Sequence, residues 1–147
     1  MDPSIRASVF VGASVDGFIA RPDHALDFLP AGEEEDHGSE AFMASVDALV
    51  FGRNTYEMVL GFDDWPYGAK PVFVLSTRPS GAPKAAGARA ERMEGEPGQI
   101  AARLAGRGYR HLYVDGGVTL QRLLRAGLIQ RLVITRVPVL IGSGIPL

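Results

Sequence analysis

The sequence contains no cysteine among its 147 residues. This absence excludes disulfide bonds, thiol nucleophiles and zinc sites with cysteine ligands. The three histidines, His24, His37 and His111, share no metal-ligand spacing. We therefore predict no metal site and expect these histidines to be surface or loop residues.

The sequence also has a small net charge and no long apolar run. A formal net charge of −2 and a pI near 5.9 provide no basic surface for nucleic acid. No apolar run approaches the ~18 residues of a membrane span, and the N-terminal stretch lacks the pattern of a secretion signal. We expect no nucleic-acid partner, no membrane partner and a cytoplasmic location.

Glycine and proline are plentiful, with 18 and 10 residues, and they predict many tight turns. Hydrophobic residues make up 46% and charged residues 22%, which is ordinary for a globular protein and too apolar for a disordered one. The length suits one domain, so we expect residues 1–147 to form a single unit.

Apolar and amphipathic segments alternate along the chain. Strands are expected at residues 5–12, 18–20, 47–52, 70–76, 88–93, 110–117 and 129–142. Helices are expected at residues 33–45, 53–61, 97–108 and 118–128. This alternation predicts an α/β fold with a mostly parallel central sheet and helices on both of its faces.

Three strand exits carry residues that suit a phosphate group. Ligands of parallel sheets collect just beyond the carboxyl ends of the strands, where helix starts present unpaired N–H groups and arginine can fork onto a phosphate. The candidates are Gly52, Arg53 and Thr55, then Ser76, Thr77 and Arg78, and finally Gly116, Gly117, Val118 and Thr119. The structural alternatives are a capped surface helix, a polar turn, and a glycine turn that only connects a strand to a helix.

The glycine pair in VDGGVTLQRLL has the most specific pattern. Gly116 and Gly117 allow a turn with positive φ, and they let a diphosphate approach the backbone at the start of the next helix. Asp115 is a candidate cap for that helix. The G-x-G-x-x-G pattern is absent, which counts against an NAD-linked Rossmann enzyme.

Taken in order, SVDGFIA, FGRNTYE, VLSTRP and VDGGVTLQRLLRAGLIQRLVITRVPVLIGSGIPL resemble the dihydrofolate reductase-like superfamily. Within it, the sequence is most similar to the reductase domain of the bifunctional riboflavin-biosynthesis protein and its stand-alone relatives. The resemblance implies a three-layer fold and an NADPH-dependent reductase that transfers a hydride to a pterin- or pyrimidine-type heterocycle. The zinc deaminase half of the bifunctional protein requires cysteines and is not expected.

The resemblance also implies roles for individual residues. It puts Gly52, Arg53 and Thr55 at a phosphate-binding helix start, Ser76, Thr77 and Arg78 beside the 2′-phosphate of NADPH, and Gly116, Gly117, Val118 and Thr119 against the diphosphate. It suggests catalytic roles for Asp16 and Asp36, although a solvated acidic helix start is the alternative for Asp36. A cis peptide bond on either side of Gly116 is a further option.

A homodimer is expected as well. The family usually continues through one or two further strands, so either a C-terminal tail is missing or the sheet has an exposed edge that a second subunit covers. The remaining expected partner is a small heterocyclic substrate. The alternative hypothesis is a non-catalytic nucleotide-binding or dimerisation module, which keeps the cofactor turn but lacks a committed proton donor.

Overall fold

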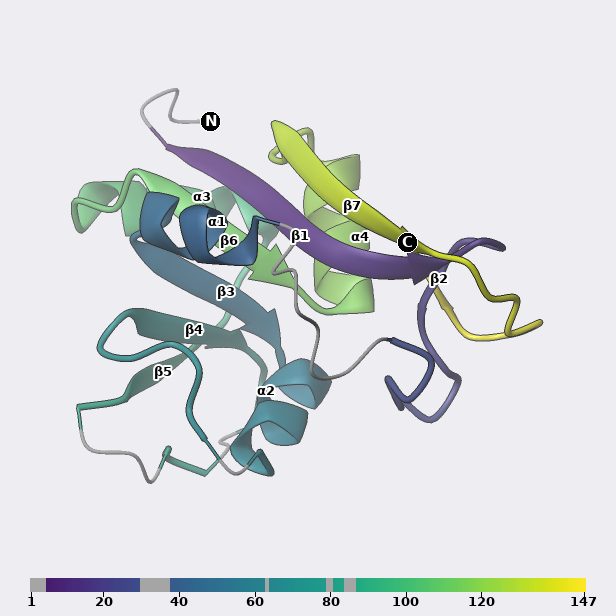
Figure 1. The fold of residues 1–147 in the computed structure, drawn as a ribbon. Coiled ribbons are helices and arrows are strands. Elements are labelled where there is room, and N and C mark those ends of the chain that lie inside the picture. Colours follow the sequence, from purple (N-terminus) through teal and green to yellow (C-terminus); the bar gives the residue numbers. More distant parts are fainter. Residues whose placement is uncertain (1–4, 30–37, 63, 79–80, 84–86) are drawn as a thin grey trace.

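The computed structural model describes residues 5–29, 38–62, 64–78, 81–83 and 87–147. Figure 1 shows strands and helices alternating along the chain. The elements are β1 (Arg6–Ser14), β2 (Phe18–Ala20), α1 (Ser39–Ser45), β3 (Ala48–Gly52), α2 (Arg53–Leu60), β4 (Pro71–Leu75), β5 (Arg89–Met93), α3 (Pro97–Gly106), β6 (His111–Asp115), α4 (Gly117–Arg125), β7 (Arg131–Val137) and β8 (Ile145–Pro146).

Six of the strands form one sheet in the order β5-β4-β3-β6-β1-β7. Every neighbouring pair in it is parallel. Leu49, Val50 and Phe51 of β3 are fully buried, as expected for a central parallel strand with both faces covered. β2 and β8 pair separately as a short antiparallel ribbon. The predicted α/β fold with a parallel central sheet is therefore confirmed.

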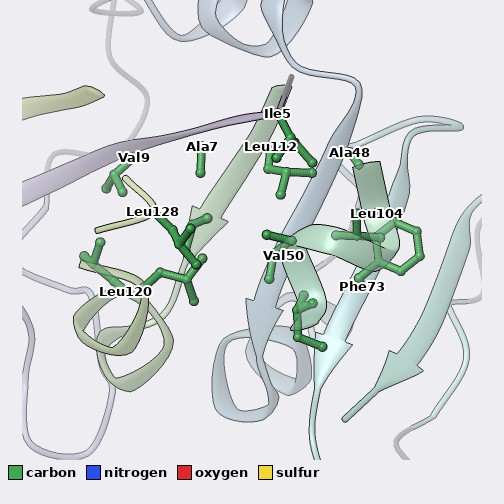
Figure 2. Close-up of a cluster of buried hydrophobic side chains, with 14 of the residues drawn as sticks. Ile5, Ala7, Val9, Ala48, Val50, Phe73, Leu104, Leu112, Leu120 and Leu128 are labelled. Atoms are coloured by element: carbon green, nitrogen blue, oxygen red, sulfur yellow. The ribbon is translucent and has the colours of Figure 1, made fainter. Parts of the chain in front are cut away.

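Helices cover both faces of this sheet, which confirms the three layers. On one face, α3 and α4 pack against β1, β3 and β6, and Figure 2 shows Leu104 and Leu120 of these helices beside Val9, Val50 and Leu112 of the strands. On the other face, α1 and α2 cover the sheet through a second cluster that includes Phe51, Tyr56, Val59 and Val72. The Phe42 ring of α1 lies 5.1 Å from the Phe10 ring.

Some boundaries differ from the predictions. The strand expected at 129–142 ends at Val137, because Pro138 has no N–H group for the ladder. β8 was not expected, and the described part of the first helix begins at Ser39. Asp36 lies outside the described residues. No helix within the described ranges is long and apolar enough to cross a lipid bilayer.

β7 is an edge strand of the large sheet. Its Leu132 and Ile134 side chains are 40% and 42% exposed. Open edges of this kind favour pairing with another chain. The homodimer stays a prediction.

Candidate functional site

A pocket of about 210 Å³ lies where the carboxyl ends of β1, β3 and β6 meet. These strands are neighbours in the sheet, with β6 between the other two. The polar residues on the described wall are His24, Asn54, Thr55, Tyr113 and Asp115, together with the backbone of Gly116 and Gly117. This is the place at which parallel α/β sheets bind their ligands.

Two strand exits form a close backbone contact beside this pocket. A Cβ atom on Gly116 would lie 2.9 Å from Thr55 Oγ1 and 3.3 Å from the Gly52 nitrogen. A Cβ atom on Gly52 would lie 2.7 Å from Thr119 Oγ1. Both positions therefore need glycine. Four predicted site residues from distant parts of the sequence are brought together here, and we call them the glycine cradle: Gly52, Thr55, Gly116 and Thr119.

The glycine pair itself differs from the expectation. Positive φ is confined to Gly116 of the pair, at 103°. At Gly117 a Cβ atom would instead clash with Ile145 Cγ2, so this glycine is needed for packing against β8. The next residue, Val118, is 71% exposed on α4. All peptide bonds of the described backbone are trans.

Asp115 lies on the pocket wall, half-buried, directly before the cradle. Its Oδ1 accepts a hydrogen bond from the Gly116 N–H at 2.8 Å, and its Oδ2 accepts one from the Tyr113 hydroxyl at 3.1 Å. Burial raises the pKa of Asp115, and the two hydrogen bonds oppose that rise. A carboxyl group with a raised pKa in a pocket is suited to proton transfer.

Sequence reasoning missed the buried setting of Asp115 because an aspartate before a glycine turn has the pattern of a helix cap. The N-cap of α4 is Gly116, and it makes no side-chain capping bond. The pKa of Tyr113 is also raised, mainly by burial and secondly by the nearby Asp115 carboxylate. The signal that was available is an acid at a strand exit, adjacent to the most specific motif.

Arg53 begins α2 beside the cradle. Its Nε lies 3.0 Å from Glu57 Oε1, which is close enough for an ion pair. The geometry is not that of a hydrogen bond, and among the described residues this buried N–H has no acceptor. Arg53 therefore places a positive charge at the start of α2, and the Glu57 carboxylate lies beside it.

The turn after β4 contains the other predicted phosphate ligands. Ser76 Oγ accepts a hydrogen bond from the Arg78 N–H at 3.0 Å and donates to the Arg78 carbonyl at 2.8 Å. Thr77 and Arg78 are exposed. Arg92 of β5, which sequence reasoning missed, donates to the Ser76 carbonyl at 3.2 Å and brings a second guanidinium group to the turn.

Asp16 was expected to be catalytic, but its described contacts are hydrogen bonds that join two loops. Its carboxylate accepts hydrogen bonds from the Ser14 hydroxyl at 2.5 Å and from the Gly142 N–H at 2.8 Å. It thereby ties the loop after β1 to the loop before β8. These contacts lower the pKa of Asp16, and the hydrogen bond from Ser14 contributes most. The described pocket wall does not include Asp16, and its catalytic role stays a prediction.

We expect Asp16→Ala to lower the melting temperature at pH 7. A lowered pKa means that folding favours the carboxylate. This stabilisation is present above the unfolded pKa of ~3.9 and is lost as the pH falls through the lower folded value. Thermal unfolding should therefore show a smaller difference in melting temperature between the wild-type protein and the variant at about pH 2 to 3 than at pH 7. Asp64→Ala, at an exposed aspartate, is the control and should melt like the wild-type protein. If Asp16→Ala also melts at the wild-type temperature at pH 7, the stabilising contact of Asp16 is contradicted.

The histidines differ in their surroundings. His24 lies in a loop, as expected, and its Nε2 is 3.3 Å from Asn54 Nδ2 on the pocket wall. His111 begins β6, within the strand expected at residues 110–117, and it is half-buried. Its ring nitrogens lie 2.7 Å from Ser8 Oγ and 2.9 Å from the Ser45 carbonyl, so it joins β6 to β1 and to the end of α1.

The chain is also similar to known proteins. The model of the RibD C-terminal domain family matches residues 6–147. The uncharacterized protein YwjB of Bacillus subtilis (strain 168) is 32% identical over 151 residues, which cover 97% of this chain and 82% of that protein.

Two solved structures are also similar. A Shewanella sp. PV-4 protein, whose assignment to riboflavin biosynthesis is provisional, is 44% identical with a TM-score of 0.85, over 97% of this chain and 82% of that one. The Thermotoga maritima diaminohydroxyphosphoribosylaminopyrimidine deaminase/5-amino-6-(5-phosphoribosylamino)uracil reductase is 11% identical with a TM-score of 0.77, over 97% of this chain and 47% of that one. The dihydrofolate reductase-like fold that the motifs implied is confirmed by this likeness.

Proposed function

The chain belongs to the RibD C-terminal domain family, and we propose that it is an NADPH-dependent reductase that transfers a hydride to a small nitrogen heterocycle. The observation that carries the proposal is the position of Asp115. A half-buried carboxyl group with a raised pKa stands on the pocket wall, directly before the glycine cradle. A nucleotide site and a proton-transferring group thus lie side by side, as a reductase of this kind requires.

The residues of the site fit NADPH. Because Gly52 and Gly116 carry no Cβ atom, the strand exits that lead into α2 and α4 lie against each other beside Thr55 and Thr119, and the starts of these two helices are brought together for a diphosphate. The Arg53 guanidinium adds a positive charge at the start of α2. Arg78 would hold the 2′-phosphate. When bound, NADPH supplies the hydride.

The side chains of the pocket have three tasks in this proposal. Asp115 holds a proton or accepts ring N–H groups, and the Tyr113 hydroxyl fixes its orientation. Apolar side chains such as Phe10 and Met58 exclude water from the ring. The Asp16 contact with Gly142 holds the loop that leads into β8, whose Ile145 lines the pocket.

The alternative is a non-catalytic nucleotide-binding or dimerisation module. The engagement of Asp16 in structural contacts favours it, because that acid was expected in catalysis. NADPH oxidation with a panel of pterins and aminopyrimidine ribitol phosphates separates the two. Oxidation with any member supports the reductase, whereas tight NADPH binding without oxidation by the whole panel supports the module.

We expect NADPH to bind roughly tenfold to hundredfold more tightly than NADH. An arginine fork on the 2′-phosphate makes charge-assisted hydrogen bonds worth ~1.5 to 3 kcal/mol, and NADH lacks that group. Arg78→Ala should therefore weaken NADPH much more than NADH in calorimetric titrations. Arg125→Ala, at the far end of α4, is the matched control. Equal affinity of the wild-type protein for both cofactors would show that the 2′-phosphate assignment is wrong.

A further inference from the structure

We propose that Tyr113 is a positioning residue whose hydroxyl group turns between two acceptors and thereby supports Asp115 in both of its protonation states. This role rests on the proposed function, in which Asp115 takes up or releases a proton. Tyr113 acts through Asp115, and it sets the pH at which that carboxyl group changes its charge.

The Tyr113 hydroxyl group has two acceptors for one hydrogen. Its oxygen lies 3.1 Å from Asp115 Oδ2 and 3.2 Å from the Phe10 carbonyl oxygen. A hydroxyl group has one hydrogen to donate and two lone pairs with which it accepts. It can therefore donate to only one of the two oxygens at a time. Because the two distances are nearly equal, rotation of the O–H bond exchanges the acceptors while the ring stays in place.

The Tyr113 ring is held by aromatic neighbours. The Phe42 ring of α1 meets it edge-on, with 5.1 Å between the ring centroids and 88° between the planes. The Phe51 ring of β3 lies at 6.1 Å, also at 88°. Edge-to-face pairs of this kind are favourable. Since burial also raises the pKa of Tyr113, its hydroxyl group keeps its hydrogen at neutral pH.

The two orientations of the hydroxyl group match the two forms of Asp115. When Asp115 is ionised, Tyr113 donates to Oδ2, while Oδ1 accepts from the Gly116 N–H at 2.8 Å. When Oδ2 takes up a proton, its new O–H group donates to the Tyr113 oxygen, and Tyr113 donates to the Phe10 carbonyl instead. Both forms of the carboxyl group are thus hydrogen-bonded, and neither carries the cost of an unpaired buried group.

Three further segments bring titratable side chains near Asp115: Tyr67 from the loop before β4, His24 from the loop after β2, and Arg53 with Glu57 from α2. The pKa of Tyr67 is raised, mainly by burial and secondly by the Asp115 carboxylate, so Tyr67 is uncharged at neutral pH. Arg53 and Glu57 carry opposite charges 3.0 Å apart, which partly cancel at a distance. Among the described side chains, Tyr113 is the one that hydrogen-bonds to Asp115.

Carbon NMR of the wild-type chain without cofactor tests this coupling. Isotope labels at aspartate Cγ and tyrosine Cζ report on both groups, and the signals are identified by their absence from Asp115→Asn and Tyr113→Phe. We expect the Tyr113 signal to move at the same pH as the Asp115 signal, well below the pH at which tyrosine ionises. This step should vanish in Asp115→Asn. A Tyr113 signal that stays constant while Asp115 titrates, or a step that persists in Asp115→Asn, would overturn the proposal.

Tyr113→Phe tests the effect on Asp115 itself. The variant keeps the ring and removes the hydroxyl group. A hydrogen bond to a carboxylate is roughly twice as strong as one to a neutral group, so the loss costs the ionised form more. The Asp115 midpoint should rise by about 1 pH unit. Tyr109→Phe, whose ring packs on Phe73 in the other core cluster, is the matched control and should leave the midpoint unchanged. An unchanged midpoint in Tyr113→Phe would overturn the role of this hydroxyl group.

The pH profile of NADPH-dependent turnover connects this role to the proposed function. The half-maximal rate that depends on Asp115 should move to higher pH in Tyr113→Phe, by the same amount as the NMR midpoint. The NMR titrations need neither cofactor nor turnover. A coupled Tyr113 signal in a chain that oxidises no NADPH would therefore uphold the hydroxyl switch and contradict the reductase, so the two failures are distinguishable.

Discussion

Asp115→Asn is expected to lower the rate of NADPH-dependent turnover by at least about a hundredfold while the fold survives. Loss of a positioned acid or base typically costs 10² to 10⁴ in rate, and an amide cannot take that role. The amide fits the same space, since its oxygen can accept from the Gly116 N–H and its nitrogen can donate to the Tyr113 oxygen. The Tyr113 hydroxyl then donates to the Phe10 carbonyl, 3.2 Å away.

The variant should also melt at no lower temperature than the wild-type protein at pH 7. Burial raises the pKa of Asp115, so folding favours its protonated form. The corresponding stabilisation is complete below the unfolded pKa and is lost as the pH rises through the raised folded value. The asparagine side chain of the variant stays uncharged as the pH rises, so the variant does not lose this stabilisation. Steady-state kinetics and thermal unfolding measure the two effects, and wild-type turnover in Asp115→Asn would refute the proton-transfer role.

Gly116→Val is expected to weaken NADPH binding by more than about a hundredfold. The residue has φ of 103°, and its Cβ would lie 2.9 Å from Thr55 Oγ1 in the cradle. The added branches would push the strand exits of the cradle apart and move two or more backbone N–H groups away from the diphosphate, each worth ~1.5 to 3 kcal/mol to a charged ligand. Calorimetric titration with NADPH measures the loss.

Gly127→Val is the matched control for this change. Gly127 also has positive φ, at 72°, but no atom lies within 4 Å of a Cβ placed there. Both variants should lose stability through backbone strain, because L residues rarely adopt this conformation. Only Gly116→Val should lose the cofactor. Similar NADPH affinity in the two variants would mean that the cradle is structural and does not bind a nucleotide.

Most of the fold follows from local patterns in the sequence. The buried run around Leu49 and Val50 predicts a central strand, and the Pro97 start with regular apolar spacing predicts α3. β8 could not be predicted in this way, because it is two residues long and depends on pairing with β2. Its partner is more than a hundred residues away in the sequence, beyond the reach of periodicity.

The candidate site was predictable as a set of strand exits but not in its contacts. Parallel sheets bind ligands beyond the carboxyl ends of their strands, and this rule identified four residues that the structure brings together: Gly52, Thr55, Gly116 and Thr119. The hydrogen bond of Asp16 spans 126 residues of sequence to Gly142, and no local pattern indicates it. The raised pKa of Asp115 likewise depends on the burial that only the assembled pocket creates.

The transfer of deuterium from NADPH deuterated at C4 of the nicotinamide tests the central claim most directly. The chain would be incubated with each C4 isotopomer and with the heterocycle of the panel that gives the fastest oxidation, and the product ring would be examined by mass spectrometry. Direct hydride transfer predicts one deuterium in the reduced ring from one of the two isotopomers. A chain that binds NADPH but yields no deuterated product with any heterocycle would contradict the reductase and support the non-catalytic module.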